Sequence, residues 1–174
     1  KCEIITIANQ KGGVGKTTTA VNLSASLAFK GKKVLLIDVD PQSNATTSLG
    51  VHRDEVEFYL YQVLTGSKKI SQIIRKTSID SLFLAPSNIG LVGFEKEYYN
   101  KKIQGREEIL KKRISEIKYD YDFIILDSPP ALGPLTINAL TASDSVLIPI
   151  QCEFFALEGL AQLLSTIKLL KEQI

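Results

Sequence analysis

The 174-residue sequence contains no tryptophan, no methionine, one histidine and two cysteines. Cys2 and Cys152 cannot build a disulfide scaffold, and no C-x-x-C pair is present to hold zinc or an iron–sulfur cluster. The single histidine, His52, cannot be combined with a serine or cysteine nucleophile into a recognisable triad pattern. These absences argue against thiolate metal sites and the common hydrolytic triads.

Long apolar runs and a strong excess of either charge are also missing. No apolar run reaches about 18 residues, so the sequence predicts no membrane span. Lys and Arg number 21 against 19 Asp and Glu, a formal net charge of +2. So balanced a chain is not a histone-like polycation, and any contact with nucleic acid must come from a local patch. The scarcity of cysteine and the lack of a secretory apolar segment favour a reduced, cytosolic setting.

Apolar segments alternate with segments of helical spacing, a pattern typical of βαβ units. We expect strands at Ile4–Ala8, Val34–Ile37, Ser81–Ala85, Phe123–Leu126 and Val146–Ile150. We expect helices at Thr17–Phe29, Asp54–Leu64, Ile70–Arg75, Gly90–Lys118 (broken near Gly105) and from Leu157 to the end of the chain. The sequence therefore predicts one α/β domain over residues 1–174, with a mostly parallel, doubly wound sheet flanked by helices.

The sharpest motif is a glycine-rich turn between the first predicted strand and the first predicted helix, Lys11-Gly12-Gly13-Val14-Gly15-Lys16-Thr17-Thr18. Glycines allow backbone N–H groups to converge on an anion, and the following helix directs its positive N-terminal end to the same place. Lys16 would then reach the β- and γ-phosphates of a nucleotide, and the hydroxyl of Thr17 would bind Mg²⁺. The motif predicts a phosphate-binding loop of the P-loop NTPase type.

The loop departs from the usual pattern G-x-x-x-x-G-K-[ST] at its start. The first glycine of that pattern would fall at position 10, where this chain has Gln10, and a second lysine, Lys11, follows it. A backbone that wraps the phosphates in the usual way does not easily aim Lys11 at its own nucleotide. Lys11 could instead reach a neighbouring nucleotide.

Three aspartates end or follow predicted strands. Asp38 and Asp40 come at the end of the second strand, and Asp127 directly follows Phe123–Leu126. In an open α/β sheet, ligands bind at the carboxyl ends of the strands, so we expect all three carboxylates near the phosphate loop. A carboxylate there can hold Mg²⁺ through water or orient an attacking water, and the residues alone leave both roles open for Asp38 and Asp40. Asp127 is expected near the metal.

Further segments make a family resemblance specific. They are Asp38–Gln42 (DVDPQ), Asp127–Gly133 (DSPPALG) with Thr136–Leu140, Gln151–Gly159 (QCEFFALEG) and Gly105–Glu107 (GRE). Together with the loop they resemble the ParA/Soj-type chromosome and plasmid partitioning ATPases, from Ile4 to Leu170. The loop alone indicates only the wider group that shares this variant loop, and the downstream segments narrow the resemblance to the ParA/Soj branch.

The resemblance implies a slow Mg²⁺-dependent ATPase in which two monomers close face to face around two ATP molecules. Lys11 would contact the partner's ATP, and Gly12 would lie where the monomers approach each other. Lys16 and Thr17 would hold phosphate and Mg²⁺. Asp40 would position the attacking water. Two further aspartates would support the metal, namely Asp38 and Asp127.

The resemblance also implies partners and a cellular place. The ATP-bound homodimer would bind double-stranded DNA non-specifically, and a ParB/Spo0J-type protein would stimulate hydrolysis and release it. Such a protein is cytoplasmic and nucleoid-associated, with no membrane attachment expected. Members of the family are usually longer, so we expect the chain to lack a C-terminal portion and to expose an apolar sheet edge or helix face. A MinD-like membrane-associated positioning ATPase, which shares the loop and the dimer, remains the alternative.

Overall fold

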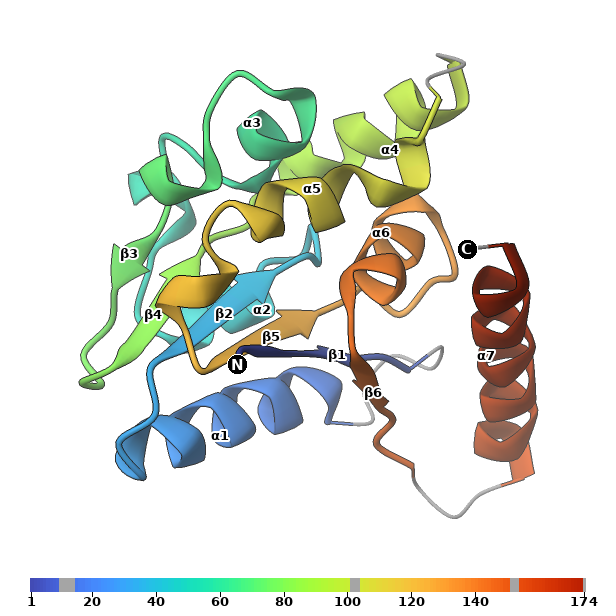
Figure 1. The fold of residues 1–174 in the computed structure, drawn as a ribbon, viewed down its shortest axis with the longest axis horizontal. Helices are drawn as coiled ribbons and strands as arrows, with labels where there is room; N and C mark the ends of the chain where they lie inside the picture. The colour runs from blue at the N-terminus through green and yellow to red at the C-terminus, as the bar shows by residue number, and fades with distance from the viewer. Residues whose placement is uncertain (10–14, 101–103, 151–153, 174) are drawn as a thin grey trace.

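The structure is a computed structural model, and it describes the chain except for residues 10–14, 101–103, 151–153 and 174. A six-stranded sheet forms the centre, with helices on both faces (Figure 1). The strands are β1 (Glu3–Ile7), β2 (Val34–Asp38), β3 (Arg75–Lys76), β4 (Leu82–Ala85), β5 (Phe123–Asp127) and β6 (Ser145–Leu147). Their order is β3-β4-β2-β5-β1-β6, and every neighbouring pair is parallel except the antiparallel pair β3–β4. The predicted fold class is therefore confirmed.

The helices are α1 (Lys16–Phe29), α2 (Asn44–Ser48), α3 (Leu60–Thr65), α4 (Val92–Asn100), α5 (Ile109–Ser115), α6 (Pro134–Ala142) and α7 (Phe154–Gln173). The central strand β2 shows how both faces are filled, because all its residues are buried. Val34 and Leu36 pack with α1 and α2, while Leu35 and Ile37 pack with α3 to α6. Burial on both faces explains why β2 reads as an unbroken apolar run.

Two predicted helices are wrong in extent. The segment predicted as one helix over Asp54–Leu64 begins with a 3₁₀ turn at Arg53–Glu55 and becomes α-helical only at Leu60. Tyr59 is extended, with φ −144° and ψ −171°, and its N–H donates to the Gln62 side chain at 2.9 Å, a cap that starts α3 there. The segment predicted as a helix over Ile70–Arg75 is a 3₁₀ turn followed by the edge strand β3.

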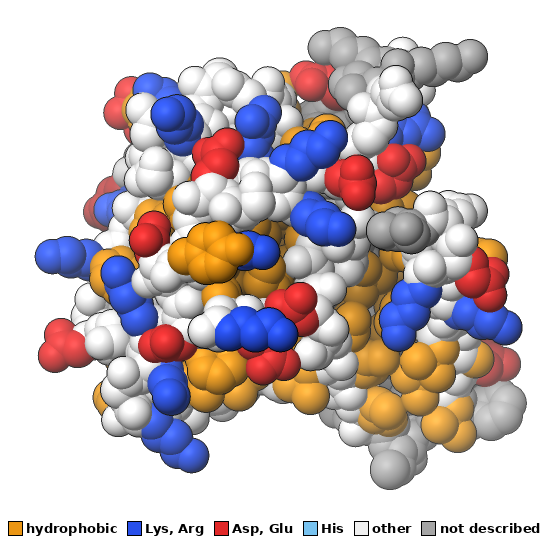
Figure 2. Space-filling view, in the orientation of Figure 1, with side chains coloured by type: hydrophobic (Ala, Val, Ile, Leu, Met, Phe, Trp, Pro, Cys, Tyr) orange, Lys and Arg blue, Asp and Glu red, His pale blue; other side chains and the backbone are white. Residues whose placement is uncertain are grey.

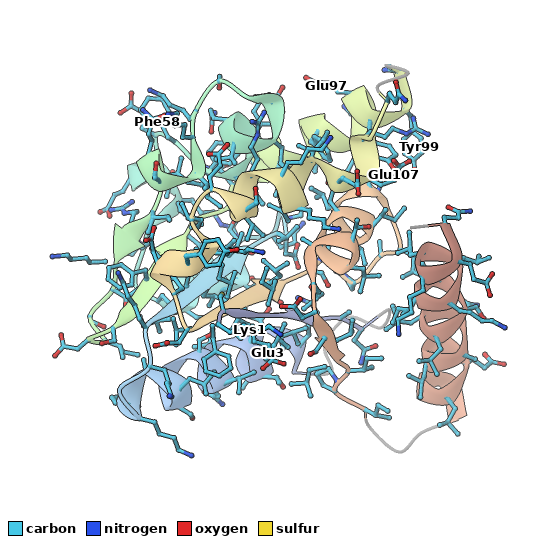
Figure 3. All side chains as sticks on the ribbon, viewed as in Figure 1. Lys1, Glu3, Phe58, Glu97, Tyr99 and Glu107 are labelled. Carbon is cyan, nitrogen blue, oxygen red and sulfur yellow. The ribbon has the colours of Figure 1, made fainter. Side chains whose placement is uncertain are left out.

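The predicted break near Gly105 is confirmed. Gly105 has φ 73°, a left-handed conformation that glycine adopts without strain, and it separates α4 from the turn that leads into α5. Arg106 secures this break, since its guanidinium lies 4.4 Å from the centre of the Tyr98 ring and donates to the Tyr98 carbonyl at 2.8 Å. The side chains of Glu97 and Tyr99 on α4 and of Glu107 in the turn lie near one another beside this break (Figure 3).

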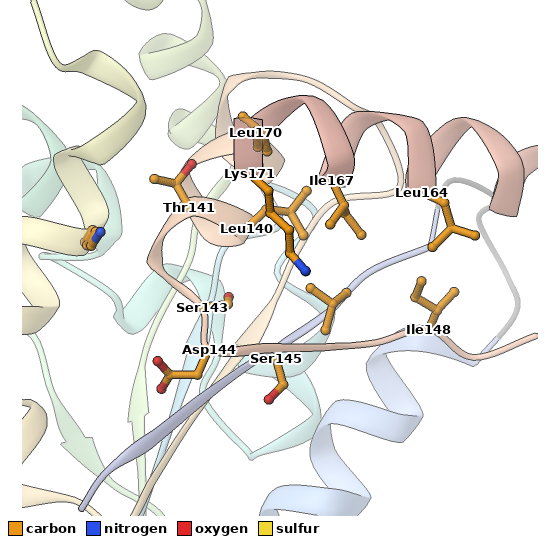
Figure 4. Close-up of a pocket in the computed structure, with 12 residues that line it drawn as sticks. Leu140, Thr141, Ser143, Asp144, Ser145, Ile148, Leu164, Ile167, Leu170 and Lys171 are labelled. Carbon is orange, nitrogen blue, oxygen red and sulfur yellow. The ribbon is translucent and has the colours of Figure 1, made fainter. Parts of the chain in front are cut away.

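β6 is an edge strand, and α7 lies alongside it at the border of the molecule (Figure 1). Leu163 is the only buried side chain among residues 157–173, and it packs on Ala8 and Leu140. Between α7, β6 and α6 lies a groove of about 520 Å³ (Figure 4). Leu164, which lines this groove, is exposed, and so are the apolar side chains Leu147, Ile150 and Leu157 elsewhere in β6, the segment after it and α7. The apolar sheet edge and helix face expected from the sequence are therefore present.

Charged side chains of both signs are interspersed over the face seen in Figure 2 and do not form one basic patch there. Lys111 and Lys112 on α5 are both exposed. None of the helices in the described part of the chain combines the length and apolar character that a membrane span requires.

Candidate nucleotide-binding site

The carboxyl ends of three strands, β1, β5 and β2, lie side by side along one end of the sheet. In the parallel ladders, Asp127 at the end of β5 is the Cα partner of Ile7 in β1 and of Asp38 in β2. The segment that leaves β1 therefore begins beside Asp127 of the neighbouring strand β5, with Asp38 of β2 one strand further on. The hydroxyl of Ser128 donates to the Ile7 carbonyl at 2.8 Å and ties the ends of β5 and β1 together. This is the sheet edge at which α/β proteins bind ligands, as the sequence predicts.

Lys16 and Thr17 begin α1 and meet at Asp127. Gly15 has φ 77°, and this left-handed turn brings the chain into the helix. The Lys16 ammonium forms an ion pair with Oδ1 of Asp127 and lies 3.8 Å from Oδ2 of Asp40. The Thr17 hydroxyl donates to the other Asp127 oxygen at 2.9 Å. The two side chains predicted to bind phosphate and metal thus share one carboxylate at a helix N-terminus, where anions are favoured.

Negative charge exceeds positive charge among the described side chains of this site. Lys16 is 8% exposed and faces two carboxylates, while a third, on Asp38, is fully buried nearby. Burial raises the pKa of Asp127, and the ammonium of Lys16 opposes that rise. Burial and the charge of Asp127 raise the pKa of Asp38 to about 7. Such a site gains from a cation.

The donor set fits Mg²⁺ bound together with phosphates. Carboxylate and hydroxyl oxygens are the ligands that Mg²⁺ prefers, and this ion usually takes one or two carboxylates and completes its shell with water and phosphate oxygens. Asp127 and Thr17 offer such oxygens at one point. The described residues contain no group of three or more His, Cys, Asp or Glu side chains around one point, so a site formed by protein groups alone is not present among them.

The segment after β2 holds Asp38 and Asp40 in different ways. The Asp38 carboxylate accepts hydrogen bonds from the N–H and hydroxyl of Thr46, at 2.9 and 2.7 Å, and from the Asp40 N–H at 3.1 Å. Asp40 is 5% exposed; its Oδ1 accepts from the Gln42 N–H at 3.0 Å, and its Oδ2 faces Lys16. Asp40 and Asp127 therefore meet at Lys16, whereas Oδ2 of Asp38 is bound to Thr46 of α2 and its Oδ1 to the Asp40 N–H.

Four predicted site residues, Lys11, Gly12, Gly13 and Val14, lie outside the described residues. Gly15 and Thr18 are described, and both are exposed at the start of α1. The structure brings Lys16, Thr17 and the three aspartates to one sheet edge.

The sequence reading missed three residues around the aspartates: Thr46, Ser87 and Glu95. Thr46 and Ser87 hydrogen-bond the Asp38–Asp40 segment. The pKa of Glu95 is raised by partial burial and by the charge of Asp40, and a Cβ on Gly133 would lie 3.2 Å from its Oε1. Glu95 thus sits between Asp40 and the start of α6. In the sequence, only Thr46 could have been suspected, because its hydroxyl lies eight residues after Asp38. No sequence pattern indicates that Ser87 or Glu95 belongs to this site.

Stability of the nucleotide-free protein is expected to fall as the pH rises. The pKa of Asp38 is about 7 in the folded protein, above its value in the unfolded chain. Between these two pKa values the folded protein binds a proton that the unfolded chain does not, which stabilises the folded state. This stabilisation is lost as the pH rises through 7. At pH 5.5, about 1.5 units below that pKa, the folded state gains about 2 kcal/mol relative to pH 8. We expect a melting temperature about 4–8 °C higher at pH 5.5.

Asp38→Asn checks this expectation, because it keeps the shape of the side chain and removes its titration. The difference in melting temperature between the two pH values should shrink in Asp38→Asn. It should persist in Asp54→Asn, which changes an exposed aspartate. An unchanged difference in Asp38→Asn would assign the effect to another group.

Comparisons with known proteins agree with this site. A family model described as an AAA domain matches residues 2–174. The chain is 52% identical over 172 residues to the sporulation initiation inhibitor protein Soj of Bacillus subtilis, covering 99% of this chain and 67% of that protein. It is 48% identical over 169 residues to the chromosome partitioning protein ParA of Myxococcus xanthus, covering 97% of this chain and 59% of that protein. The chain thus spans about three fifths to two thirds of these relatives.

The fold also matches solved structures. A crystal structure described as cobyrinic acid a,c-diamide synthase from Mycobacterium smegmatis, with bound ADP and magnesium, gives a TM-score of 0.93 at 40% sequence identity. The match covers 99% of this chain and 69% of that one. A protein with nearly the same arrangement of strands and helices thus holds a nucleotide with magnesium.

Proposed function

Because the chain belongs to the family of the Soj and ParA partitioning proteins, we propose that it is the nucleotide-binding domain of a slow, partner-stimulated Mg²⁺-ATPase that acts in chromosome or plasmid partitioning. The observation that carries the proposal is the meeting of Lys16, Thr17 and Asp40 around Asp127 at the start of α1. A buried lysine at a helix N-terminus, flanked by carboxylates, is suited to a bound phosphate with its metal.

The charge balance implies that nucleotide and metal bind together. When Lys16 contacts the β- and γ-phosphates, they share with Asp127 the ammonium that now pairs with Asp127 alone. Asp127 would then be a buried carboxylate with a weakened counter-charge, which is costly. Mg²⁺, when bound, neutralises charge on the phosphates and on the carboxylates that face it. Thr17 and Asp127 would hold the metal, supported by Asp38, and the backbone of residues 12–18 would cradle the phosphates.

Asp40 is proposed to orient the attacking water. Its Oδ1 is fixed by the Gln42 N–H, its carbonyl accepts from Ser43 N–H at 2.9 Å, and its Oδ2 points to Lys16. A carboxylate held in this way is kept in place to hydrogen-bond a water beside Lys16, which is what a positioning group requires.

The wider cycle rests on the family. We propose that ATP closes two copies of the protein into a homodimer, with Lys11 contacting the partner's nucleotide and Gly12 allowing close approach. The dimer would bind double-stranded DNA without sequence preference, and a ParB/Spo0J-type protein would stimulate hydrolysis and release it. The partitioning names of the relatives support this cycle over the MinD-like, membrane-associated alternative.

One measurement separates the two functions. The full-length protein with Asp40→Ala, which should retain ATP, is loaded with ATP and Mg²⁺ and offered random-sequence duplex DNA or anionic lipid vesicles, with ADP as the control. We expect ATP-dependent binding to DNA that weakens steeply with salt, and none to vesicles. Binding to vesicles without DNA would instead support the membrane-associated function, and equal binding with ADP would contradict an ATP-gated cycle.

A further inference from the structure

Two buried hydroxyl groups connect the Asp38–Asp40 segment to the end of β4. Thr46, on α2, and Ser87, two residues beyond β4, are both fully buried. The Ser87 N–H donates to Oγ1 of Thr46 at 3.0 Å, and the Ser87 hydroxyl donates to the carbonyl of Asp40 at 2.6 Å. We call this pair the Thr46–Ser87 clamp. It touches both aspartates, although it contributes no group to Lys16 or Thr17.

The direction of the hydrogen bonds in the clamp is determined by chemistry. The backbone N–H of Ser87 can only donate, so Oγ1 of Thr46 must accept from it. The proton of the Thr46 hydroxyl is then left for Oδ2 of Asp38, 2.7 Å away. The Thr46 N–H donates to the same Oδ2 at 2.9 Å. One residue therefore fills both acceptor positions of that oxygen.

The other carboxylate oxygen of Asp38, Oδ1, can still accept a further hydrogen bond or bind a metal ion. Oδ1 accepts one hydrogen bond, from the Asp40 N–H at 3.1 Å. A carboxylate oxygen offers about two acceptor positions, so a single position on Oδ1 remains. The clamp thus decides which atom of this fully buried carboxylate can meet a metal ion or a water bound to it.

Ser87 acts on the backbone of Asp40. Its hydroxyl holds the Asp40 carbonyl, and the preceding Pro86 is itself fixed, because its carbonyl accepts from the Leu60 N–H at 3.1 Å. The position of Asp40 therefore depends on the end of β4, a strand that is not the neighbour of β1 and β5.

We propose that Thr46 and Ser87 are positioning residues for ATP hydrolysis: Thr46 presents Oδ1 of Asp38 to Mg²⁺, and Ser87 holds Asp40 where it orients water. The inference rests on the proposed function. It assigns different effects to the two residues, because Thr46 acts through a metal-supporting carboxylate and Ser87 through the water-orienting segment. If the clamp served stability alone, removing either hydroxyl would lower the melting temperature without changing the Mg²⁺ requirement or kcat.

The variants are chosen in matched pairs. Thr46→Val keeps the shape and removes the hydroxyl, whereas Thr46→Ser keeps the hydroxyl. Its control is Thr47→Val, the same change at the exposed next position of α2, where the hydroxyl contacts only the Ser43 carbonyl. Ser87→Ala removes the contact with Asp40, and its control is Ser24→Ala, a fully buried serine whose hydroxyl has no hydrogen-bond partner in the described part of the chain.

Three readouts are compared in the full-length protein: the Mg²⁺ concentration for half-maximal binding of a fluorescent ATP analogue, kcat at saturating Mg²⁺, and the melting temperature. Removing a group that holds a metal-bound carboxylate costs about 10–100-fold. We expect Thr46→Val to raise the Mg²⁺ requirement by about that factor, and Thr46→Ser to stay within about threefold of the wild type. Ser87→Ala should lower kcat by about tenfold or more, with an unchanged Mg²⁺ requirement.

The inference is overturned if folded Thr46→Val and Ser87→Ala keep the wild-type Mg²⁺ requirement and kcat, whatever their melting temperatures. Equal losses in the control variants would overturn it as well. If Thr46→Val does not fold, Ser87→Ala decides alone, because it leaves both bonds from Thr46 to Asp38 in place. A wild-type protein that binds no ATP would contradict the proposed function itself, which keeps the two failures distinguishable.

Discussion

Lys16→Ala is expected to lose ATP binding and hydrolysis together. The Lys16 ammonium is the only described cation that pairs with Asp127, and it also faces Asp40 at 3.8 Å. Removing it leaves phosphate oxygens without their donor and a fully buried carboxylate without its counter-charge. Loss of one such donor costs about 100- to 1,000-fold in kcat, and we expect at least that loss here. Calorimetry with ATP and Mg²⁺, together with steady-state turnover, measures both effects.

The same substitution should destabilise the nucleotide-free protein. Breaking a buried pair by removing one partner costs about 3–5 kcal/mol in the free energy of unfolding. The loss should be smaller at low pH, because Asp127, whose pKa burial already raises, then takes up a proton and no longer needs a cation. Lys32→Ala, at an exposed lysine just beyond α1, is the control. Wild-type turnover by Lys16→Ala would remove the phosphate role from this residue.

Asp40→Ala should separate binding from hydrolysis. The Asp40 carboxylate lies close to Lys16 yet makes none of the hydrogen bonds that fix Asp127 or Thr17. ATP affinity should therefore stay within about threefold of the wild type. Loss of the group that orients water should reduce kcat by about 100-fold or more, a typical contribution of a positioned acid or base.

Single-turnover hydrolysis measures this loss directly, because it does not depend on product release. Asp120→Ala, which changes an exposed aspartate, serves as the matched control and should hydrolyse ATP at the wild-type rate. Wild-type single-turnover hydrolysis by Asp40→Ala would assign the attacking water to another residue, and Glu95, whose pKa is raised by the charge of Asp40, would be the first to test.

The features of the site that could be predicted from the sequence are those that follow from local pattern. A glycine turn between an apolar strand and a helix, and aspartates at the ends of apolar strands, must meet when the strands are parallel. The register of Asp38 beside Asp127 follows from that rule and is observed. The family resemblance, carried by the segments around these aspartates, is confirmed by the relatives.

What could not be predicted depends on contacts between distant positions. Ser87 lies 41 residues from Thr46 along the chain, and no local pattern reports that its N–H will meet that hydroxyl. The same holds for Tyr59, whose extended backbone starts α3 late, although the residues before it carry helical spacing. The fully buried Asn138 is a third case, because its amide oxygen accepts from the Leu110 N–H at 3.2 Å and so joins α6 to α5.

The attachment of α7 has a consequence for local unfolding. Leu163 is the only buried side chain among residues 157–173, and it rests on Ala8, which directly follows β1. Among residues 157–173, α7 is held by Leu163 and by the partly buried Ile167 and Leu170, so it opens at a lower free energy than the fully buried central strands and its amides exchange with solvent first. Any ligand that binds beside the end of β1 would also stabilise Ala8, on which Leu163 packs. The hydrogen-exchange protection of α7 would therefore report on the occupancy of the site, although α7 contributes no predicted ligand to it.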